Sequence, residues 1–380
     1  MSTSNPLDFL YKLIATQYPG ATRILSVNLV ALICSVSTSD FFAASMFTMS
    51  FMVSMSGTAV ATQAYVENRE LSTFDSVCYV VVLTVFSAPF GFMLWDGSHF
   101  QFFMIVIFSI FYSMSEIIRS QLMSKGRFKD LAVRGMIGCF FILISVFTFQ
   151  NYEILVTGAI ILSSFITISY GGGIVRISKG LRKNITKDIF SYSISNIFST
   201  GFSFLFPLFL ISEFGESSAT TIAQVFTCSF LFYSYPRLLS ATFLSEYKLS
   251  ENKYLYADFD RKCNKFILIS IFFIGFFIYV LKPMLEPYFV FIIALVCSQL
   301  SLPASNLIMM KGRGGILLKV NIVSLVLLMV SVGLQIFMFA PSNFRTQLIL
   351  FSYLMYHLAR YFYLKFFITK SYQLEYIGRK

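Results

Sequence analysis

The chain has 380 residues, of which 57% are hydrophobic and 12% are charged. A soluble domain is about half apolar and about a quarter charged, so this composition excludes a protein that hides its apolar residues in an aqueous fold. The net charge of +11 would also suit a nucleic-acid-binding protein. However, the cations stand in the gaps between apolar stretches, where anionic lipid headgroups are the expected neighbours, and we expect no nucleic-acid partner.

Apolar stretches of roughly 20 residues, the length of a helix that crosses a bilayer, fill nearly the whole chain. The sequence therefore predicts an all-α polytopic membrane protein with twelve transmembrane helices. The expected spans are 14–37, 40–66, 76–95, 100–122, 131–149, 152–170, 188–211, 218–245, 264–282, 287–309, 315–339 and 344–368.

The cations fall into every second gap between these spans. The gaps on the side of the N-terminus are basic, whereas the alternate gaps carry mainly acids. The basic gaps include Lys125, Arg127, Lys129, Arg176, Lys179, Arg182, Lys183, Lys248, Lys253, Arg261, Lys262, Lys265, Lys311 and Arg313. By the positive-inside rule, both termini are expected in the cytoplasm.

The organisation is expected to be two lobes of six helices, at residues 1–170 and 187–380. A basic cytoplasmic linker, 171–186, separates them and begins with three glycines. Because six is an even number, both lobes start on the same side of the membrane, so any internal repeat is parallel.

A Lys-Gly-Arg turn follows both the fourth and the tenth expected span, at 125–127 and at 311–313. One interpretation is that a short cytoplasmic hairpin needs a glycine for its tight backbone and cations for its side of the membrane. The other is duplication of a six-helix unit. The matching position within each lobe favours duplication.

Residue patterns for catalysis or metal binding are missing from the sequence. His99 and His357 are the two histidines, and the six cysteines occur singly in apolar stretches. The Gly171–Gly173 run lacks the Gly-Lys-Ser/Thr ending of a nucleotide-phosphate loop. We therefore expect no catalytic residue, no metal and no cofactor, and the chain is not expected to be an enzyme.

Arginines inside the spans are the most informative residues, because a charge in a membrane helix is costly and usually faces a cavity or a partner. Arg23 lies near mid-membrane if its helix begins near Leu13, or at the interface if Pro19 and Gly20 delay that start. Arg237 follows Pro236, which can kink a helix toward a cavity. Snorkelling of Arg237 to the surface is the alternative.

Other residues of these spans support the same hypothesis. Arg360 lies in its span at a depth similar to that of Arg237, one helical turn after His357. Tyr233 and Tyr235 are candidates to pack against sugar rings. Glu116 and Arg119 are spaced to form a structural ion pair on one helix face.

Two six-span lobes, a basic linker, the Lys-Gly-Arg turn and the arginines of spans 1 and 8 resemble the polysaccharide exporters of the multidrug/oligosaccharidyl-lipid/polysaccharide superfamily, and the O-antigen flippases in particular. The resemblance implies a multi-pass protein of the bacterial inner membrane. It implies alternating-access transport of an undecaprenyl-pyrophosphate-linked oligosaccharide, an O-antigen or capsule repeat unit. In related lipid flippases spans 1, 2, 7 and 8 line the cavity, and Arg23 and Arg237 match the arginines that receive the pyrophosphate.

Within this interpretation Arg360 is a further substrate-binding candidate, and Asp40 is the candidate for ion coupling. The implied partners are the lipid-linked oligosaccharide, membrane lipids, a polysaccharide polymerase and a chain-length regulator. Two alternatives remain open. A multidrug antiporter of similar fold would present carboxylates to cationic drugs, and a membrane glycan polymerase or transferase would need a base or nucleophile facing an outer loop.

Overall fold

The computed structural model describes residues 6–67, 73–95, 97–124, 126–148, 185–214, 219–250, 253–280 and 288–377. These residues form helices and short connections, with no strand among them. The elements are α1 (Pro6–Ile33), α2 (Val36–Met55), α3 (Gly57–Glu67), α4 (Thr73–Phe92), α5 (His99–Ser124), α6 (Phe128–Thr148), α8 (Ile185–Asn196), η1 (Ile197–Gly201), α9 (Phe202–Phe214), α10 (Ala219–Ser250), α11 (Lys253–Val280), α13 (Phe289–Ser298), η4 (Gln299–Ser301), α14 (Leu302–Met310), α15 (Gly314–Met338) and α16 (Asn343–Ile377).

The predicted fold class, an all-α polytopic membrane protein, is confirmed. Each expected span coincides with a helix or a short series of helices, apart from 152–170, which lies outside the described residues, as does most of the expected linker 171–186. Six helical stretches of the described chain are long and apolar enough to cross a membrane. The helices that carry Arg23, Arg237 and Arg360 are not among them.

Interruptions divide three of the expected spans. The second is divided at Ser56 into α2 and α3, the seventh contains the π-helical turn η1, and the tenth contains the 3-10 turn η4. Such irregular turns inside a helix often mark functional or strained positions. Sequence patterns did not predict them, because each interrupted span reads as one continuous apolar stretch.

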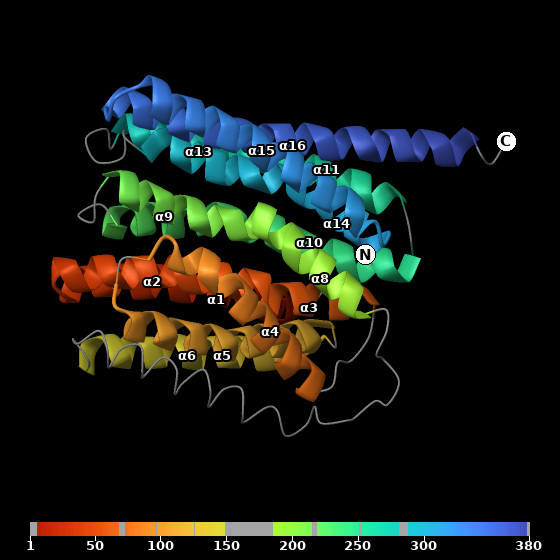
Figure 1. Ribbon diagram of the computed structural model, residues 1–380. Coiled ribbons are helices and arrows are strands. Elements are labelled where there is room, and N and C mark those ends of the chain that lie inside the picture. Colours follow the sequence, from red (N-terminus) through yellow and green to blue (C-terminus); the bar gives the residue numbers. More distant parts are fainter. Residues whose placement is uncertain are drawn as a thin grey trace. The chain divides into compact units, whose positions relative to one another are not determined.

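The described residues form two compact units, 1–228 and 229–380. α10 contributes residues to both units, since its bounds are Ala219–Ser250. In the first unit α1 packs along α6, α2 packs against α4, α5 and α9, and α3 packs against α5 and α8. Figure 1 shows the helices of this unit running alongside one another.

Small polar residues let the helices of the first unit approach closely. A Cβ on Gly57 would lie 2.5 Å from the Cα atom of Ser113, so α3 and α5 nearly touch at this point. The Ser56 and Ser113 hydroxyl groups are 2.7 Å apart. Ser193 of α8 donates a hydrogen bond to the Met55 carbonyl at 2.7 Å. Small residues that hydrogen-bond across helices are typical of membrane helix packing.

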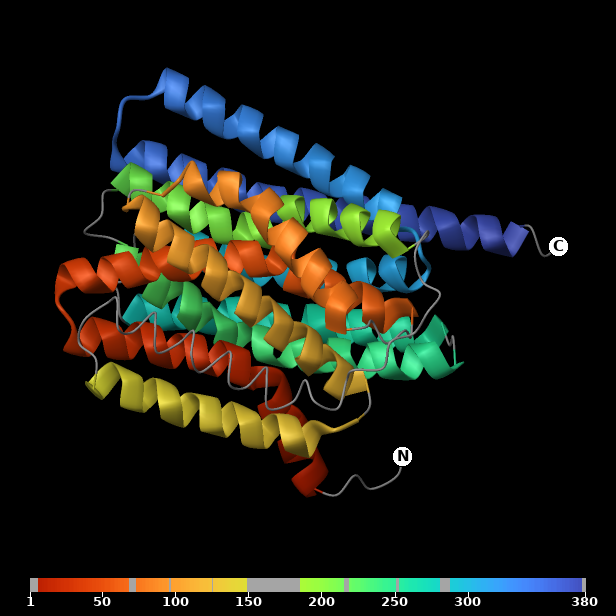
Figure 2. The ribbon, with the colours of Figure 1, turned by 60° about the horizontal axis from the view of Figure 1, so that its bottom comes forward.

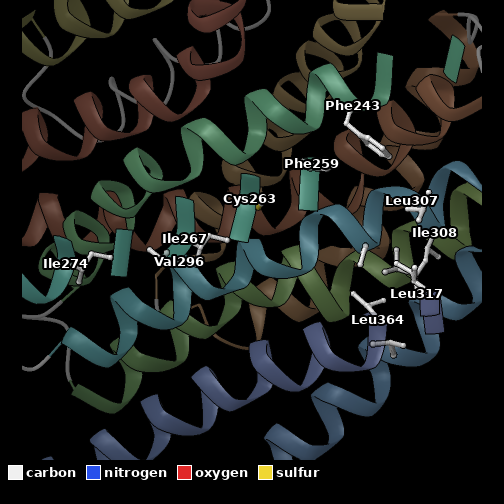
Figure 3. Packing of buried hydrophobic residues seen from close by; sticks show 13 residues of the cluster. Phe243, Phe259, Cys263, Ile267, Ile274, Val296, Leu307, Ile308, Leu317 and Leu364 are labelled. Carbon is white, nitrogen blue, oxygen red and sulfur yellow. The ribbon is translucent and has the colours of Figure 1, made fainter. Parts of the chain in front are cut away.

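The second unit surrounds an apolar cluster contributed by α10, α11, α13, α14, α15 and α16. Figure 3 shows this cluster extending along the helices, with Ile274 at one end and with Leu307, Ile308 and Leu317 gathered near the other. In Figure 1 the long helix α16 projects beyond α13 and α15 of the same unit. The cluster therefore holds α16 over only part of its length.

The two Lys-Gly-Arg turns have the same backbone geometry. Gly126 and Gly312 adopt φ angles of +70° and +66°. Each glycine N–H donates to the carbonyl three residues earlier, at 3.0 and 2.9 Å, and each following arginine N–H donates to the carbonyl five residues earlier, at 2.9 and 3.1 Å. This is the Schellman helix ending, and it is found in both units at the matching helix pair, α5–α6 and α14–α15.

Candidate functional site

The backbone of Arg23 lies inside a continuous helix. α1 runs from Pro6 to Ile33, so the expectation that Pro19 and Gly20 delay the helix start is wrong. Figure 2 shows instead that α1 bends along its length, as an internal proline allows. The apolar stretch Ile24–Ile33 follows Arg23, and at 1.5 Å per residue it covers about 15 Å, half of a roughly 30 Å hydrocarbon layer.

Polar side chains of α1 and α10 meet in the first unit. Gln224 donates a hydrogen bond to the Asn28 side-chain oxygen at 3.3 Å, and Asn28 in turn donates to the Ile24 carbonyl at 2.7 Å. Asn28 stands on α1 between Arg23 and the helix end at Ile33. The helix that carries Arg23 is thus joined to α10 by amide groups within the expected membrane depth.

Asp40 holds the beginning of α10. Its side chain accepts hydrogen bonds from the backbone N–H of Thr220 at 2.9 Å and from the Thr220 hydroxyl group at 2.6 Å. Thr220 is the second residue of α10, and the unpaired N–H groups and the positive dipole of a helix start favour a carboxylate. Asp40 is buried, so this structural role stands beside its proposed role in ion coupling.

Glu116 and Arg119 form an ion pair on α5. The Arg119 Nη2 and Nε atoms donate to one Glu116 carboxylate oxygen at 2.5 and 3.0 Å. The side chain of Glu116 is 12% exposed and that of Arg119 is 24% exposed. The pair therefore neutralises its own charge on a single helix.

Arg237 lies over two aromatic rings of its own helix. Its guanidinium carbon is 5.3 Å from the ring centre of Phe230 and 5.5 Å from that of Tyr233. Both rings are buried and meet edge to face. Cation–π contacts of this kind stabilise a charge that has left bulk water. Arg237 lies about 27 Å along α10 from Ala219.

The two candidate tyrosines do not share one environment. Tyr233 is buried beneath Arg237, whereas Tyr235 is exposed on its outer side and packs against Phe266 of α11, with ring centres 4.9 Å apart. Residues two apart in a helix point to nearly opposite faces. Tyr233 therefore shares the environment of Arg237, and Tyr235 does not.

Arg360 is bound by neutral side chains from three neighbouring segments. Its Nε atom donates to the Asn321 side-chain oxygen at 2.7 Å, its Nη1 atom to the Ser301 hydroxyl group at 2.8 Å and its Nη2 atom to the Ser305 hydroxyl group at 3.4 Å. The 3-10 turn η4 ends at Ser301 and leads directly into α14. The irregular turn of the tenth span thus lies at the guanidinium.

His357 lies one turn before Arg360 on α16 and is almost completely buried. Its ring meets Tyr353 and Tyr356 edge to face, at centre distances of 4.6 and 4.8 Å. Neither ring nitrogen has a hydrogen-bond partner among the described residues. His357 and the two tyrosines around it thus adjoin Arg360 on the same helix.

Further polar contacts tie the second unit together at both sides of Arg360. Lys365 forms an ion pair with Asp260 of α11. Asn306 of α14 donates to the Ser240 hydroxyl group of α10 at 2.6 Å. Within the described chain, no group of histidine, cysteine and acidic side chains could hold a metal ion.

Several of these partners were missed by sequence reasoning. Asn321 stands in the strongly apolar stretch Gly314–Met338, and an amide in such a span was a usable signal. Ser301 and Ser305 carried no signal, because serine is common throughout the chain. The role of Asp40 at α10 was also hidden, since its partner Thr220 lies far away in the sequence.

The chemistry available in the described residues is mainly cationic. Arg237 lies over aromatic rings and Arg360 is bound by neutral oxygens, while the buried Asp40 and the partly buried Glu116 already have hydrogen-bond donors. Guanidinium groups bind phosphate oxygens well because they are permanently charged, planar and weakly hydrated. The Arg360 guanidinium, whose hydrogen-bond partners are neutral, can therefore attract an anion.

Comparison with known proteins finds no matching family model and no matching curated protein. Solved structures do match over nearly the whole chain. A mutant of the MATE transporter VcmN from Vibrio cholerae matches with a TM-score of 0.63 and 10% identity, covering 96% of each chain. An inward-facing multidrug resistance MATE family transporter of the MOP superfamily matches with a TM-score of 0.59 and 12% identity, covering 94% of this chain and 95% of that one.

A third match is a MATE protein in what is described as the straight conformation. Its TM-score is 0.62 at 12% identity, with 95% of this chain and 94% of that chain covered. Identity at this level establishes the arrangement of the chain and leaves the substrate open. This protein is a polytopic membrane protein with the fold of the MATE transporters.

Proposed function

We propose that the chain is an alternating-access exporter that moves an undecaprenyl-pyrophosphate-linked oligosaccharide, an O-antigen or capsule repeat unit, across the bacterial inner membrane. The observation that carries this proposal is the positive sign of the charge on two partly buried side chains of the helices. Arg360 is held by neutral oxygens and Arg237 by aromatic rings. A substrate with pyrophosphate oxygens would supply the negative charge that these guanidinium groups attract.

The depth of the arginines supports the same substrate. Arg237 and Arg360 lie about 27 Å and about 26 Å along their helices from Ala219 and Asn343. The cation pattern assigns those helix starts to the outer side, so both arginines would stand near the cytoplasmic leaflet. Arg23 stands near mid-membrane on α1. A pyrophosphate in the cytoplasmic leaflet would therefore lie at the depth of Arg237 and Arg360.

In this mechanism the two lobes alternate between openings toward the cytoplasm and toward the periplasm. The polyprenyl tail stays in the lipid, because burying it elsewhere would gain nothing, while the sugars pass through the protein. Tyr233, beneath Arg237, is the aromatic residue placed to support that guanidinium during substrate binding. A polysaccharide polymerase and a chain-length regulator remain the proposed partners.

The second candidate function is a multidrug antiporter, which the match to a multidrug resistance MATE transporter favours. Such a protein needs an acidic group that can release its partners to bind a cationic drug or a coupling ion. Asp40 is the relevant residue, but it accepts two hydrogen bonds at the start of α10. The antiporter therefore requires that Asp40 leave Thr220 during transport.

The test is to replace Arg23, Arg237 and Arg360 singly by alanine in a host whose surface glycan depends on this protein. We expect each change to reduce surface glycan at least tenfold, with the protein level unchanged. Arg127→Ala is the matched control, because Arg127 is exposed and pairs with Asp130 in a turn. Normal glycan in Arg23→Ala and Arg237→Ala would refute the proposal, and drug resistance on overexpression would favour the antiporter.

A further inference from the structure

A half-open pocket lies beside the Lys-Gly-Arg turn of the second unit. Its empty space, counted together with the open solvent at its mouth, is about 290 Å³. Its apolar walls come from three helices: Leu307 and Ile308 of α14, Ile316 of α15, and Phe367 and Ile368 of α16. Lys311 and Arg313 complete the lining. The pocket thus joins a strongly apolar surface to two cations.

The equivalent turn of the first unit shows what is special about this pocket. In that turn Arg127 forms an ion pair with Asp130, three residues later, at 2.6 Å. The residue three positions after Arg313 is Ile316, which is a wall of the pocket. The same backbone turn therefore carries a carboxylate in one unit and an apolar surface in the other.

The backbone of the turn that carries Lys311 and Arg313 is held by hydrogen bonds. Gly312 adopts the left-handed conformation, and the Arg313 N–H is hydrogen-bonded to the Ile308 carbonyl at 3.1 Å. Leu307 and Ile308 also belong to the apolar cluster of the second unit, and Figure 3 shows them beside Leu317. Because these walls belong to a packed core, a ligand would bind with little loss of conformational entropy.

We propose that this pocket binds an anionic phospholipid of the cytoplasmic leaflet. The phosphate would contact Lys311 and Arg313, and the first part of an acyl chain would cover Ile316 and Phe367. Charge complementarity selects the headgroup, since arginine suits phosphate oxygens and basic residues beside a membrane attract anionic lipids. A free phosphate would leave the apolar walls in contact with water.

The proposal uses the orientation that the cation pattern predicts, in which this turn faces the cytoplasm. It does not depend on the identity of the transported substrate. The expected role of the lipid is to hold the cytoplasmic ends of α14, α15 and α16 together, because the pocket takes its lining from all three helices.

The test begins with the full-length protein in nanodiscs that contain phosphatidylcholine and a varied fraction of phosphatidylglycerol. Bound lipid is measured by native mass spectrometry, and thermal stability by the unfolding midpoint. We expect wild-type protein to retain phosphatidylglycerol and to gain stability from it. Equal retention of phosphatidylglycerol and phosphatidylcholine would overturn the proposal without any variant.

Two double variants then locate the site. Lys311→Ala with Arg313→Ala should weaken phosphatidylglycerol binding about 30-fold, since each cation near an anionic surface contributes roughly 1 kcal/mol. Lys125→Ala with Arg127→Ala, the sequence-equivalent change in the other unit, should leave binding within about twofold of wild type. Equal losses in the two variants would show nonspecific charge attraction and overturn the proposal.

A third variant tests the wall without removing a cation. Ile316→Asp copies the Arg127–Asp130 spacing of the first unit, so it should add a negative charge beside the pocket and reduce phosphatidylglycerol binding at least fivefold. Ile316→Leu should bind as wild type does. Inorganic phosphate that stabilises the protein as well as phosphatidylglycerol would exclude the acyl-chain contact, and unchanged binding in Ile316→Asp would also contradict the assigned site.

Discussion

Arg119 in the first unit and Arg360 in the second are both membrane-helix arginines with hydrogen-bonded guanidinium groups, but their partners differ in kind. Arg119 pairs with Glu116 on its own helix, at 2.5 Å. Arg360 has no ion pair among the described residues and binds an amide and two hydroxyl oxygens from α14, α15 and η4. The first arrangement cancels a charge locally, whereas the second keeps the charge and joins several helices to it.

This difference teaches how the same residue type can serve packing or function. An i, i+3 pair forms as soon as one helix forms, so it carries little information about the rest of the fold. A guanidinium held by neutral groups remains a source of positive potential in a low-dielectric surrounding, where electrostatic interactions are stronger than in water. The second kind is therefore the better candidate for binding an anion.

The largest effect is expected when Arg360 loses its shortest hydrogen bond. Asn321→Leu removes the amide oxygen that lies 2.7 Å from Arg360 Nε and is fully buried. We expect stability to fall by about 2 kcal/mol, since hydrogen bonds to charged groups contribute roughly 1.5–3 kcal/mol. Thermal unfolding in detergent measures this.

Asn321→Asp is the matched variant, because it keeps the acceptor and supplies a carboxylate to Arg360. It should retain or increase stability while weakening any bound anion. Equal destabilisation by the Leu and Asp variants would show that Asn321 acts through packing and would remove the contrast with Arg119.

A smaller effect is expected at the paired arginine. Glu116→Gln leaves Arg119 with a neutral acceptor in a partly exposed site, so we expect a loss of about 1 kcal/mol. Adding Arg119→Gln should recover most of that loss, because both charges are then gone. Thermal unfolding of the single and double variants tests this coupling, and strictly additive losses would contradict a self-contained pair.

Asp40 is the acidic counterpart of Arg360, because it too is bound by neutral groups. Asp40→Ala removes the acceptor at the start of α10 and should cost about 1 kcal/mol, the usual effect of a lost N-terminal cap. Asp40→Asn keeps an acceptor oxygen and should cost less. If Asp40→Asn keeps wild-type stability but abolishes transport, the carboxylate charge itself is needed, as ion coupling requires.

The smallest effect is expected at the exposed pairs near the start of α11. The hydrogen bond from Lys262, followed by that from Arg261, lowers the pKa of Asp258 below its ordinary 3.8. Its contribution to stability is therefore full above about pH 4 and is lost as the pH falls through the lowered pKa. Lys262→Ala should raise the pKa of Asp258 toward its ordinary value, which a carbon-13 carboxyl titration measures.

For Lys262→Ala the change in stability at neutral pH should stay below about 0.5 kcal/mol, because exposed helix pairs contribute little. This variant sets the baseline for the comparison. A loss as large as that of Asn321→Leu would mean that the exposed pair of Lys262 and Asp258 stabilises the protein as much as the hydrogen bond between Arg360 and Asn321 does.

The helices and the two glycine turns could be predicted from the sequence because their signals are local. Apolar length defines a span, and a glycine between cations marks the end of a hairpin helix, as Gly126 and Gly312 do. The interruptions at Ser56, η1 and η4 could not be predicted, since they depend on close contact with other helices. Gly57 against Ser113 is one such contact.

The candidate site was predictable in its residues but not in its partners. Arg237 and Arg360 stand out as charges in apolar stretches. Their partners require knowledge of which helices pack together. Asn321 and Ser301 reach Arg360 from segments far away along the chain, and Asp40 meets Thr220 across an even longer separation. Periodicity and charge patterns contain no such pairing information.

The glycines of the two Schellman turns have one further consequence, which concerns chirality. In the part of the chain that the structure describes, no neighbouring atom lies within 4 Å of a Cβ placed on Gly126 or Gly312, so space there does not require glycine at either position. The left-handed backbone does, because an L-side chain there costs roughly 1–2 kcal/mol. A D-alanine at either position would fit both the conformation and the open space, and it would be the least disruptive site-specific label for each hairpin.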